Sequence, residues 1–225
     1  AHNSIGNFGP AYQLNSRLVQ DFADVKLYKR LQVRILINLK KYQEALDLAQ
    51  ELITTSSHDE SGNNIVPAYY YYLRGDAFLR LHRYREAYQD LKLVVESVPG
   101  QFDALHKLGC CCYALGNYEE SVEWFEKSTQ VQPLYRVAIA DCARALKKMG
   151  KLEEALEKYL KAYSMSARTW TGLLYEIVEL QRRLKYYEHA IALLNAHLML
   201  VQNKQQQQQA NQNPGLQVKQ AQPAL

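Results

Sequence analysis

The chain repeats itself every 34 residues, and this period restricts its fold more than any other feature of the sequence. Residues of one kind return at the same place in successive units: Gly75 and Gly109, Tyr84 and Tyr118, Pro99 and Pro133, Gly116 and Gly150. A fixed period of this size indicates a stack of similar supersecondary units, each of which buries its apolar face against its neighbours. Such stacks function through an extended surface more often than through a catalytic pocket.

Each unit has the pattern of two amphipathic helices joined by a tight turn. In the middle unit, apolar or small residues recur at helical spacing over residues 103–115, and Gly116-Asn117 then breaks the pattern with turn chemistry. The pattern resumes over residues 118–131 and stops at Gln132-Pro133. No strand pattern is present, so the sequence predicts an all-α chain. The ten expected helices cover residues 26–39, 42–54, 67–81, 84–97, 103–115, 118–131, 135–149, 152–165, 168–184 and 187–202.

Three segments are expected along the chain. Residues 1–25 form an N-terminal segment that is partly helical, and residues 26–202 form the helical array, in which residues 54–67 are a long polar loop between two units. Residues 203–225 begin with a glutamine run and hold no aromatic residue, so we expect a disordered Gln-rich tail. No apolar run approaches the roughly 20 residues that cross a bilayer, and residues 1–10 lack the features of a signal peptide. We therefore expect no membrane insertion.

The four cysteines are Cys110, Cys111, Cys112 and Cys142. Three consecutive helical residues point in directions about 100° apart, so they do not form disulfides of normal geometry with one another. Their spacing is not the C-x-x-C spacing of a zinc site. We expect reduced cysteines that pack as small residues, which indicates a reducing compartment. The predicted location is the cytoplasm, and the nucleus is left open.

The large, small and aromatic positions of the repeat resemble those of the tetratricopeptide repeat (TPR) family. That family places a large residue, Leu-Gly and an aromatic residue in the first helix of a pair, and Ala, an aromatic residue and a closing Pro in the second. The three central units match with Leu105, Leu108, Gly109, Cys112, Ser121, Phe125 and Pro133; with Tyr71, Gly75, Phe78, Ala87, Leu91 and Pro99; and with Ile139, Ala143, Leu146, Ala155 and Tyr159. Two departures are Arg74, where Leu is expected, and Cys112, where Tyr is expected. The resemblance implies a right-handed superhelical solenoid of about five antiparallel helix pairs, whose first helices line a concave groove.

Groove-facing positions taken from this resemblance give a candidate peptide-binding site. The candidate residues are Arg30, Arg34, Tyr69, Tyr72, Asp76, Arg80, His106, Tyr113, Arg144, Lys147, Lys148, Tyr175 and Arg182, with Ile37, Asn38, Leu79, Asp103, Cys110, Val137, Glu179 and Arg183 beside them. Basic residues outnumber acidic ones in this set, and tyrosines lie among them. This combination suits an extended acidic peptide, or a terminal carboxylate held by forked Arg contacts. The alternative is a solvated helix face whose charges serve solubility only.

Catalytic and metal-binding patterns are missing from the sequence. The six histidines are scattered, and none has the spacing of a His-Glu-x-x-His metal site. There is no phosphate-binding Gly-rich loop and no nucleophile elbow. The pairs Glu119-Glu120 and Glu153-Glu154 open helices, where anions offset the positive helix end. We expect no enzyme activity, no cofactor and no metal.

Nucleic-acid binding is a further alternative, because helical repeats of about 35 residues can read one RNA base per unit. Such a protein would carry recurring base-reading residues at one site of each unit. The five residues at that site differ in character: Arg34, Asp76, Cys110, Arg144 and Glu179. The net charge of +4 is also mild. The sequence therefore favours peptide binding over RNA binding.

A co-chaperone is another alternative, since some TPR proteins bind chaperone tails through a clamp of Lys, Asn, Asn, Lys and Arg. The matching positions are Arg30, Arg34, Leu73, Asp103 and His106. Leu73 cannot supply the amide, and Asp103 would repel a terminal carboxylate, so the clamp is not expected.

The sequence therefore predicts a non-catalytic protein-interaction scaffold. It would hold an extended or helical acidic segment of a partner protein in a basic groove. The alternative is a structural subunit that associates with itself in a larger assembly, so that the chain would form a homo-oligomer. The contacts would then be apolar faces near residues 14–22 or 193–201. The glutamine tail would serve as a passive linker; the alternative is that it adds coiled or self-associating contacts.

Overall fold

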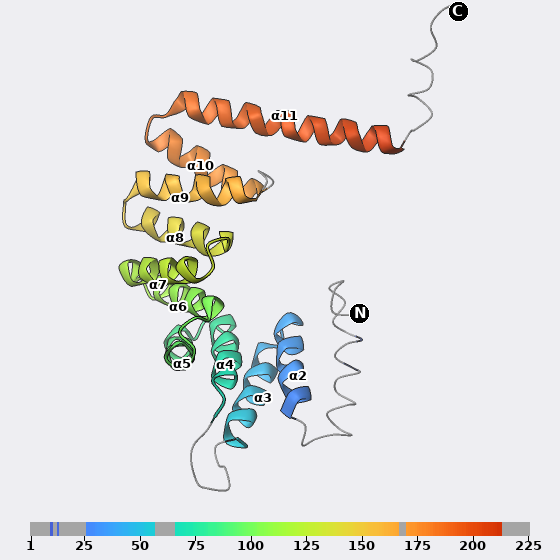
Figure 1. The fold of residues 1–225 in the computed structure, drawn as a ribbon, viewed down its shortest axis with the longest axis vertical. Coiled ribbons are helices and arrows are strands. Elements are labelled where there is room, and N and C mark those ends of the chain that lie inside the picture. The colour runs from blue at the N-terminus through green and yellow to red at the C-terminus, as the bar shows by residue number, and fades with distance from the viewer. Residues whose placement is uncertain (1–9, 11–12, 14–25, 57–65, 167–169, 213–225) are drawn as a thin grey trace, which may run out of the picture. The chain divides into compact units, whose positions relative to one another are not determined.

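The computed structural model describes residues 10, 13, 26–56, 66–166 and 170–212, and in this part of the chain the regular elements are helices (Figure 1). The predicted all-α class of paired helices is confirmed. The expected structure of residues 1–25, most of the loop 54–67 and the tail beyond residue 212 lie outside the described residues. The helices are α2 (Lys26–Asn38), α3 (Tyr42–Thr54), α4 (Ala68–Arg80), α5 (Tyr84–Ser97), α6 (Phe102–Ala114), α7 (Tyr118–Val131), α8 (Arg136–Lys148), α9 (Leu152–Met165), α10 (Thr171–Arg183) and α11 (Tyr187–Gln212).

The chain divides into two compact units, residues 1–150 and residues 151–225. Helices α2 to α8 belong to the first unit, and α9 to α11 belong to the second. The boundary falls in the turn between α8 and α9, inside the fourth predicted helix pair. The repeat pattern does not signal this boundary.

In the first unit, each helix packs against the next one along the chain. The first helix of each pair also contacts the first helix of the following pair, so that α2, α4, α6 and α8 adjoin in order (Figure 1). The second helices of the pairs are α3, α5 and α7. This arrangement separates the unit into a set of first helices and a set of second helices.

The turn inside each pair uses one backbone conformation. A residue with φ between +60° and +85° stands at the same place in every pair: Lys40, His82, Gly116, Gly150 and Lys185. In the turns at residues 40, 82, 116 and 185, the following amide donates a hydrogen bond to the carbonyl five residues earlier. This left-handed helix cap is easiest for glycine, because other residues lose roughly 1–2 kcal/mol in that conformation. The turn geometry is therefore retained even where glycine is absent.

Small residues let the two helices of a pair approach closely, as the sequence predicts. A Cβ atom added to Gly109 would lie 2.6 Å from ring atoms of Phe125, whose side chain is buried. A Cβ atom at Gly75 would lie 3.0 Å from Cγ of Leu91. The Ser121 hydroxyl, on α7, donates to the Gly109 carbonyl oxygen at 2.8 Å. Close packing and this hydrogen bond together hold α6 against α7.

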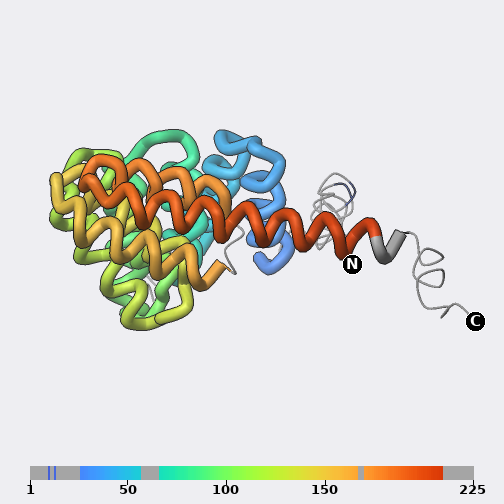
Figure 2. Tube along the Cα trace, turned by 90° about the horizontal axis from the view of Figure 1, so that it is seen from above, coloured from blue at the N-terminus to red at the C-terminus, as the bar shows by residue number. Residues whose placement is uncertain are grey.

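In the second unit, α10 packs against both α9 and α11. Helix α11 continues to Gln212, so residues 203–212, which we expected in a disordered tail, are helical. The physical reason is that glutamine favours helix almost as well as lysine, and no Gly or Pro interrupts the chain before Pro214. The second half of α11 extends beyond the ends of α9 and α10 (Figures 1 and 2). Among the described helices, none is both long and apolar enough to cross a membrane.

Candidate functional site

The first helices of the first unit carry a strongly positive charge. Helices α2, α4, α6 and α8 hold eleven Lys or Arg residues and only three acidic residues. The basic residues are Lys26, Lys29, Arg30, Arg34, Arg74, Arg80, Lys107, Arg136, Arg144, Lys147 and Lys148, and the acidic ones are Asp76, Asp103 and Asp141. We call the surface of these four helices the first-helix face.

The second helices of the same unit carry the opposite charge. Helices α3, α5 and α7 hold ten acidic residues and three basic residues. The acidic residues are Glu44, Asp47, Glu51, Glu86, Asp90, Glu96, Glu119, Glu120, Glu123 and Glu126, and the basic ones are Arg85, Lys92 and Lys127. The mild net charge of the whole chain thus conceals two oppositely charged sets of helices.

Aromatic rings connect α2 to α4 on the first-helix face. The Arg30 guanidinium lies 5.8 Å from the centroid of the Tyr69 ring, within the range of a cation–π contact. The Tyr69 ring stacks on the Tyr72 ring with 5.9 Å between centroids. The Tyr72 hydroxyl then donates to a carboxylate oxygen of Asp103 on α6. Three successive first helices are linked in this way.

Lys107 lies at the centre of a half-buried ion cluster between α4 and α6. Its Nζ atom is 2.7 Å from Oδ2 of Asp103 and 3.7 Å from Oδ1 of Asp76. Burial alone would lower the pKa of Lys107, but Asp76, Tyr72 and Asp103 together raise it. Burial opposes a low pKa for Asp103 as well, yet Lys107 and Tyr72 hold that pKa below its usual value. Burial raises the pKa of Tyr72 to about 12. At neutral pH the cluster therefore holds the Lys107 cation, the Asp103 carboxylate and a neutral Tyr72.

A second polar cluster joins α6 to α8. His106 Nε2 lies 2.8 Å from Oδ2 of Asp141, and the Tyr135 hydroxyl lies 3.3 Å from His106 Nδ1. Arg144 donates to the other carboxylate oxygen of Asp141 at 2.6 Å. Cys110 Sγ lies 3.7 Å from His106 Nε2. The contacts of His106 with Asp141 and Tyr135 connect α6 to α8 and to the residue that precedes α8. The contact of Arg144 with Asp141 lies within α8, and that of Cys110 with His106 lies within α6.

A pocket of about 210 Å³ opens beside this second cluster. Its lining is mainly apolar and aromatic, with the paired Asp141 and Arg144 among it. The lining residues are Leu79, Tyr84, Cys110, Tyr113, Ala114, Phe125, Asp141 and Arg144. Such a pocket has the size and chemistry for one apolar side chain of a partner.

Most predicted groove residues of the first unit take part in these features. Arg30, Tyr69, Tyr72, Asp76, His106 and Arg144 belong to the linked clusters, and Tyr113 lines the pocket. Arg34, Arg80 and Lys148 are exposed, and Lys147 is half-buried. Leu73, at an amide position of the chaperone clamp, is buried in the core. Tyr175 and Arg182 lie on α10 in the second unit, where Arg182 pairs with Glu179. Peptide binding by these residues stays a prediction.

Three residues of the clusters were absent from the predicted groove: Lys107, Tyr135 and Asp141. Helical spacing in the sequence could have indicated Asp141, because it stands four residues after Val137 and three before Arg144, two predicted groove residues. Lys107 likewise follows Asp103 by four residues. Tyr135 directly precedes α8, and no periodic pattern marks it.

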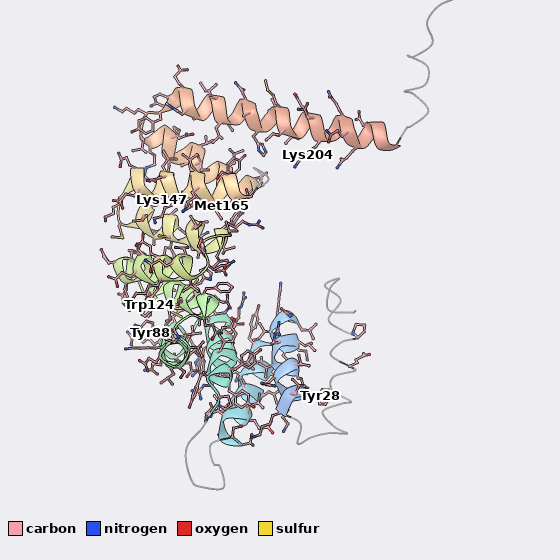
Figure 3. All side chains as sticks on the ribbon, viewed as in Figure 1. Tyr28, Tyr88, Trp124, Lys147, Met165 and Lys204 are labelled. Atoms are coloured by element: carbon pink, nitrogen blue, oxygen red, sulfur yellow. The ribbon has the colours of Figure 1, made fainter. Side chains whose placement is uncertain are left out.

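The second helices have a simpler link between repeats. Tyr88 on α5 donates to Oε1 of Glu120 on α7 at 2.7 Å, and the Trp124 indole N–H donates to the same oxygen at 3.1 Å. Figure 3 labels Tyr88 and Trp124 on these two helices. The hydroxyl of Tyr88 lowers the pKa of Glu120, against the effect of burial. The carboxylate here is held by neutral donors, whereas Asp103 on the first helices is held by a lysine.

Residues 102–135, which contain α6 and α7, match the family model described as tetratricopeptide repeat. This segment is a tetratricopeptide repeat, and the predicted resemblance to that family is confirmed. The matched residues include His106, Cys110 and Tyr135.

Among curated proteins, the chain is similar to anaphase-promoting complex subunit 6 of Arabidopsis thaliana. The two are 28% identical over 109 residues, which cover 45% of this chain and 20% of that protein. The chain thus spans about a fifth of the length of the curated relative it matches.

Solved structures share the TPR fold at low sequence identity. A thermophilic TPR protein of Thermus thermophilus superposes with a TM-score of 0.64 at 18% identity, over 79% of this chain and 92% of that chain. MamA, residues 41 to the end, of Desulfovibrio magneticus RS-1 gives a TM-score of 0.63 at 16% identity, over 75% and 91% of the two chains. At such identities the likeness establishes the solenoid fold alone.

Proposed function

We propose that this TPR protein is a non-catalytic scaffold that binds an extended or helical segment of an acidic protein partner on its first-helix face. The charge difference between the two sets of helices is the observation that carries the proposal. Repeat proteins of this kind bind partners through extended concave surfaces. The clusters and the pocket supply the aromatic and polar contacts that such a surface needs.

Attraction for an acidic partner comes from the outer parts of the face rather than from its centre. Lys107 is neutralised by Asp76 and Asp103, so it adds little field. Arg34 on α2 and Lys148 on α8 are exposed, and the Arg144 side chain is 50% exposed while it pairs with Asp141. Exposed charges of this kind steer encounter and fix the register of a bound segment.

The pocket supplies an anchor for the same segment. An apolar side chain that enters it leaves water and meets aromatic groups, among them Tyr113 and Phe125. A neighbouring acidic residue of the partner would reach the Arg144 guanidinium, which has several N–H donors besides the one that Asp141 occupies. The expected ligand is an acidic segment with one large apolar residue.

The test measures binding of synthetic peptides that carry one Leu or Phe among acidic, neutral or basic neighbours. The acidic peptides should bind most tightly. Combined substitution of Arg144→Glu, Lys147→Glu and Lys148→Glu should weaken that binding at least about tenfold, which corresponds to about 1.4 kcal/mol. Calorimetry or fluorescence anisotropy at two salt concentrations gives the affinities.

A matched control changes the net charge equally on the second helices. Arg85→Glu, Lys92→Glu and Lys127→Glu alter three exposed residues of α5 and α7. The first-helix variant should lose affinity, and this control should keep most of it. Equal losses in both variants would show a non-specific charge effect and would remove the proposed face.

A second candidate function is self-association through α11. Tyr187, Ile191, Leu194, Leu198 and Val201, which we call the α11 seam, are spaced by four and three residues. Each is exposed, by 38% to 56%. The side of α11 next to the seam faces its own unit, since Ala190 is buried and His197 shares a hydrogen bond with Tyr163 at 2.8 Å.

The seam has the spacing that packs two helices as a coiled coil, and a second copy of the chain would supply an identical seam. Helix α11 contains two Asp, Glu, Lys or Arg residues, Glu188 and Lys204, so little charge repulsion opposes pairing. Light scattering across concentration tests this function. Leu194→Lys with Leu198→Lys should abolish a dimer, and Ala192→Lys with Met199→Lys, off the seam, should retain it. A wild-type chain that stays monomeric at high concentration would eliminate this candidate.

A further inference from the structure

The cluster between α6 and α8 brings three metal-ligand side chains together. His106 and Cys110 stand one helical turn apart on α6, and Asp141 lies on α8. One atom of each, imidazole nitrogen, thiol sulfur and carboxylate oxygen, lies within 4.8 Å of the other two. We propose that His106, Cys110 and Asp141 form a zinc site with a fourth coordination position open to the neighbouring pocket.

The ligand atoms are close to the separations that zinc requires. Zinc binds imidazole nitrogen and carboxylate oxygen at about 2.0–2.2 Å and thiolate sulfur at about 2.3 Å, which places tetrahedral ligand atoms roughly 3.3–3.7 Å apart. Cys110 Sγ and His106 Nε2 are 3.7 Å apart. His106 Nε2 and Asp141 Oδ2, at 2.8 Å, share a proton and need to separate by about half an ångström to hold zinc instead. Side-chain rotation provides a shift of this size without movement of the helices.

Outer hydrogen bonds already orient the ligands. The Tyr135 hydroxyl contacts His106 Nδ1 at 3.3 Å, which leaves Nε2 directed at the cluster. Arg144 holds Oδ1 of Asp141 at 2.6 Å and leaves Oδ2 for the metal. Zinc-binding histidines and carboxylates generally have such partners on their remaining atoms. These contacts distinguish the cluster from a chance meeting of three side chains.

The open position follows from the pocket. Cys110 and Asp141 line it, together with Arg144, and its volume of about 210 Å³ admits a water molecule or a donor atom of a bound partner. The mixed set of nitrogen, sulfur and oxygen ligands favours zinc over magnesium and calcium, which take oxygen ligands. Three protein ligands with one free position is an arrangement that zinc adopts in proteins.

Proton balance gives the site a second readout. Zinc takes the lone pair of His106 Nε2, so in the bound state the imidazole proton is on Nδ1, where the Tyr135 hydroxyl oxygen can accept it. The Cys110 thiol loses its proton to solvent on forming the zinc–sulfur bond. Binding therefore releases the thiol proton.

The experiment titrates the full chain with Co²⁺, whose thiolate complexes have an intense near-ultraviolet charge-transfer absorption, and then displaces it with Zn²⁺. The wild-type chain should show this band with one equivalent of metal. Cys110→Ser should lose the band, and His106→Ala and Asp141→Asn should bind zinc at least about tenfold more weakly. Cys111→Ala removes a neighbouring buried thiol outside the cluster and should behave as the wild type.

Circular dichroism of each metal-free variant shows whether it is folded, and Asp141→Asn, which keeps the size of the side chain, remains informative if His106→Ala unfolds. Proton release in a weakly buffered solution reports the loss of the Cys110 thiol proton. A wild-type chain without the band, or a band that persists in Cys110→Ser, would overturn the zinc site. These measurements need no protein partner, so their outcome is independent of the proposed scaffold function.

Discussion

The first and second helices of the first unit have the same packing pattern and opposite charge. Small residues stand at the contact between the two sets, as Gly75 and Gly109 do on the first helices and Ala87 and Ser121 on the second. Yet eleven basic residues lie on the first helices, and ten acidic residues lie on the second. Close packing requires the small residues but not this division of charge. Part of this charge joins the two sets, since Arg74 pairs with Asp90 at 2.7 Å and Lys29 with Glu51 at 3.0 Å. The exposed remainder is a property of the surface.

The two sets also differ in how they link successive repeats. A tyrosine hydroxyl donates to a carboxylate of the next repeat in both cases, from Tyr72 to Asp103 and from Tyr88 to Glu120. Only Asp103 has a half-buried cation beside it, Lys107. The first helices thus hold charge in a partly dry position because it is paired. On the second helices, Asp90 is buried against Arg74 of α4, while Glu120 is held by the neutral donors Tyr88 and Trp124.

Lys107→Met should give the largest loss of stability. It leaves Asp76 and Asp103 without their cation in a position where the Lys107 side chain is only 15% exposed, and we expect the free energy of unfolding to fall by about 3 kcal/mol. Denaturant unfolding measures the change. Lys92→Met on α5, which removes an exposed lysine, is the matched control and should change stability by less than about 0.5 kcal/mol. Similar losses in the two variants would contradict the distinction between paired and solvated charge.

Gly109→Ala should weaken the contact between a first and a second helix. The added methyl group meets the buried Phe125 ring at 2.6 Å, and the cost of overpacking exceeds the gain in helix propensity. The expected net loss is about 2 kcal/mol in the free energy of unfolding. Gly75→Ala, where the nearest atom is 3.0 Å away, should cost less. Thermal unfolding of both variants decides the order, and a larger effect at Gly75 would disagree with the packing described.

Tyr88→Phe tests the link between second helices and its pH dependence. The pKa of Glu120 is lowered in the folded state, first of all by the Tyr88 hydroxyl. This contribution is therefore present above the unfolded pKa of about 4.3 and is lost as the pH falls through the folded pKa. We expect a loss of about 1 kcal/mol at pH 7 that shrinks on acidification to pH 3.

Tyr72→Phe serves as the comparison on the first helices. Lys107 is the principal group that lowers the pKa of Asp103, so removal of the Tyr72 hydroxyl should leave more of the acid dependence of stability in place. Stability curves at several pH values between 3 and 7 measure both variants. If Tyr72→Phe and Tyr88→Phe lose the same acid-dependent part of the stability, Lys107 does not contribute to the pH dependence as described.

Lys40→Gly should produce the smallest effect, and a favourable one. Lys40 is exposed and has φ of 61° in the turn between α2 and α3, where glycine avoids steric strain. We expect the free energy of unfolding to rise by about 0.5–1 kcal/mol. Gly116→Ala, at the equivalent turn with φ of 85°, should lower it by a similar amount. Thermal melting measures both variants. A higher melting temperature for Lys40→Gly and a lower one for Gly116→Ala would support a shared turn geometry.

The amino-acid sequence alone determined the helix pairs, their turns and the small packing positions. Those features are local: the period of apolar residues specifies each helix, and Gly116 and Pro133 punctuate the pattern within a few residues. The sequence also contained the excess of basic residues on the first helices. It did not reveal the left-handed turn residues Lys40, His82 and Lys185, because no side-chain preference marks them.

Only the tertiary structure decided which charges meet. Tyr72 and Asp103 are 31 residues apart, and His106 and Asp141 are 35 apart, so their contacts depend on how one repeat packs on the next. A shift of a few ångströms between repeats would separate them without changing any helix. The ion cluster of Lys107 and the three ligands of the proposed zinc site are therefore products of repeat stacking, whereas the helices that carry them follow from local sequence.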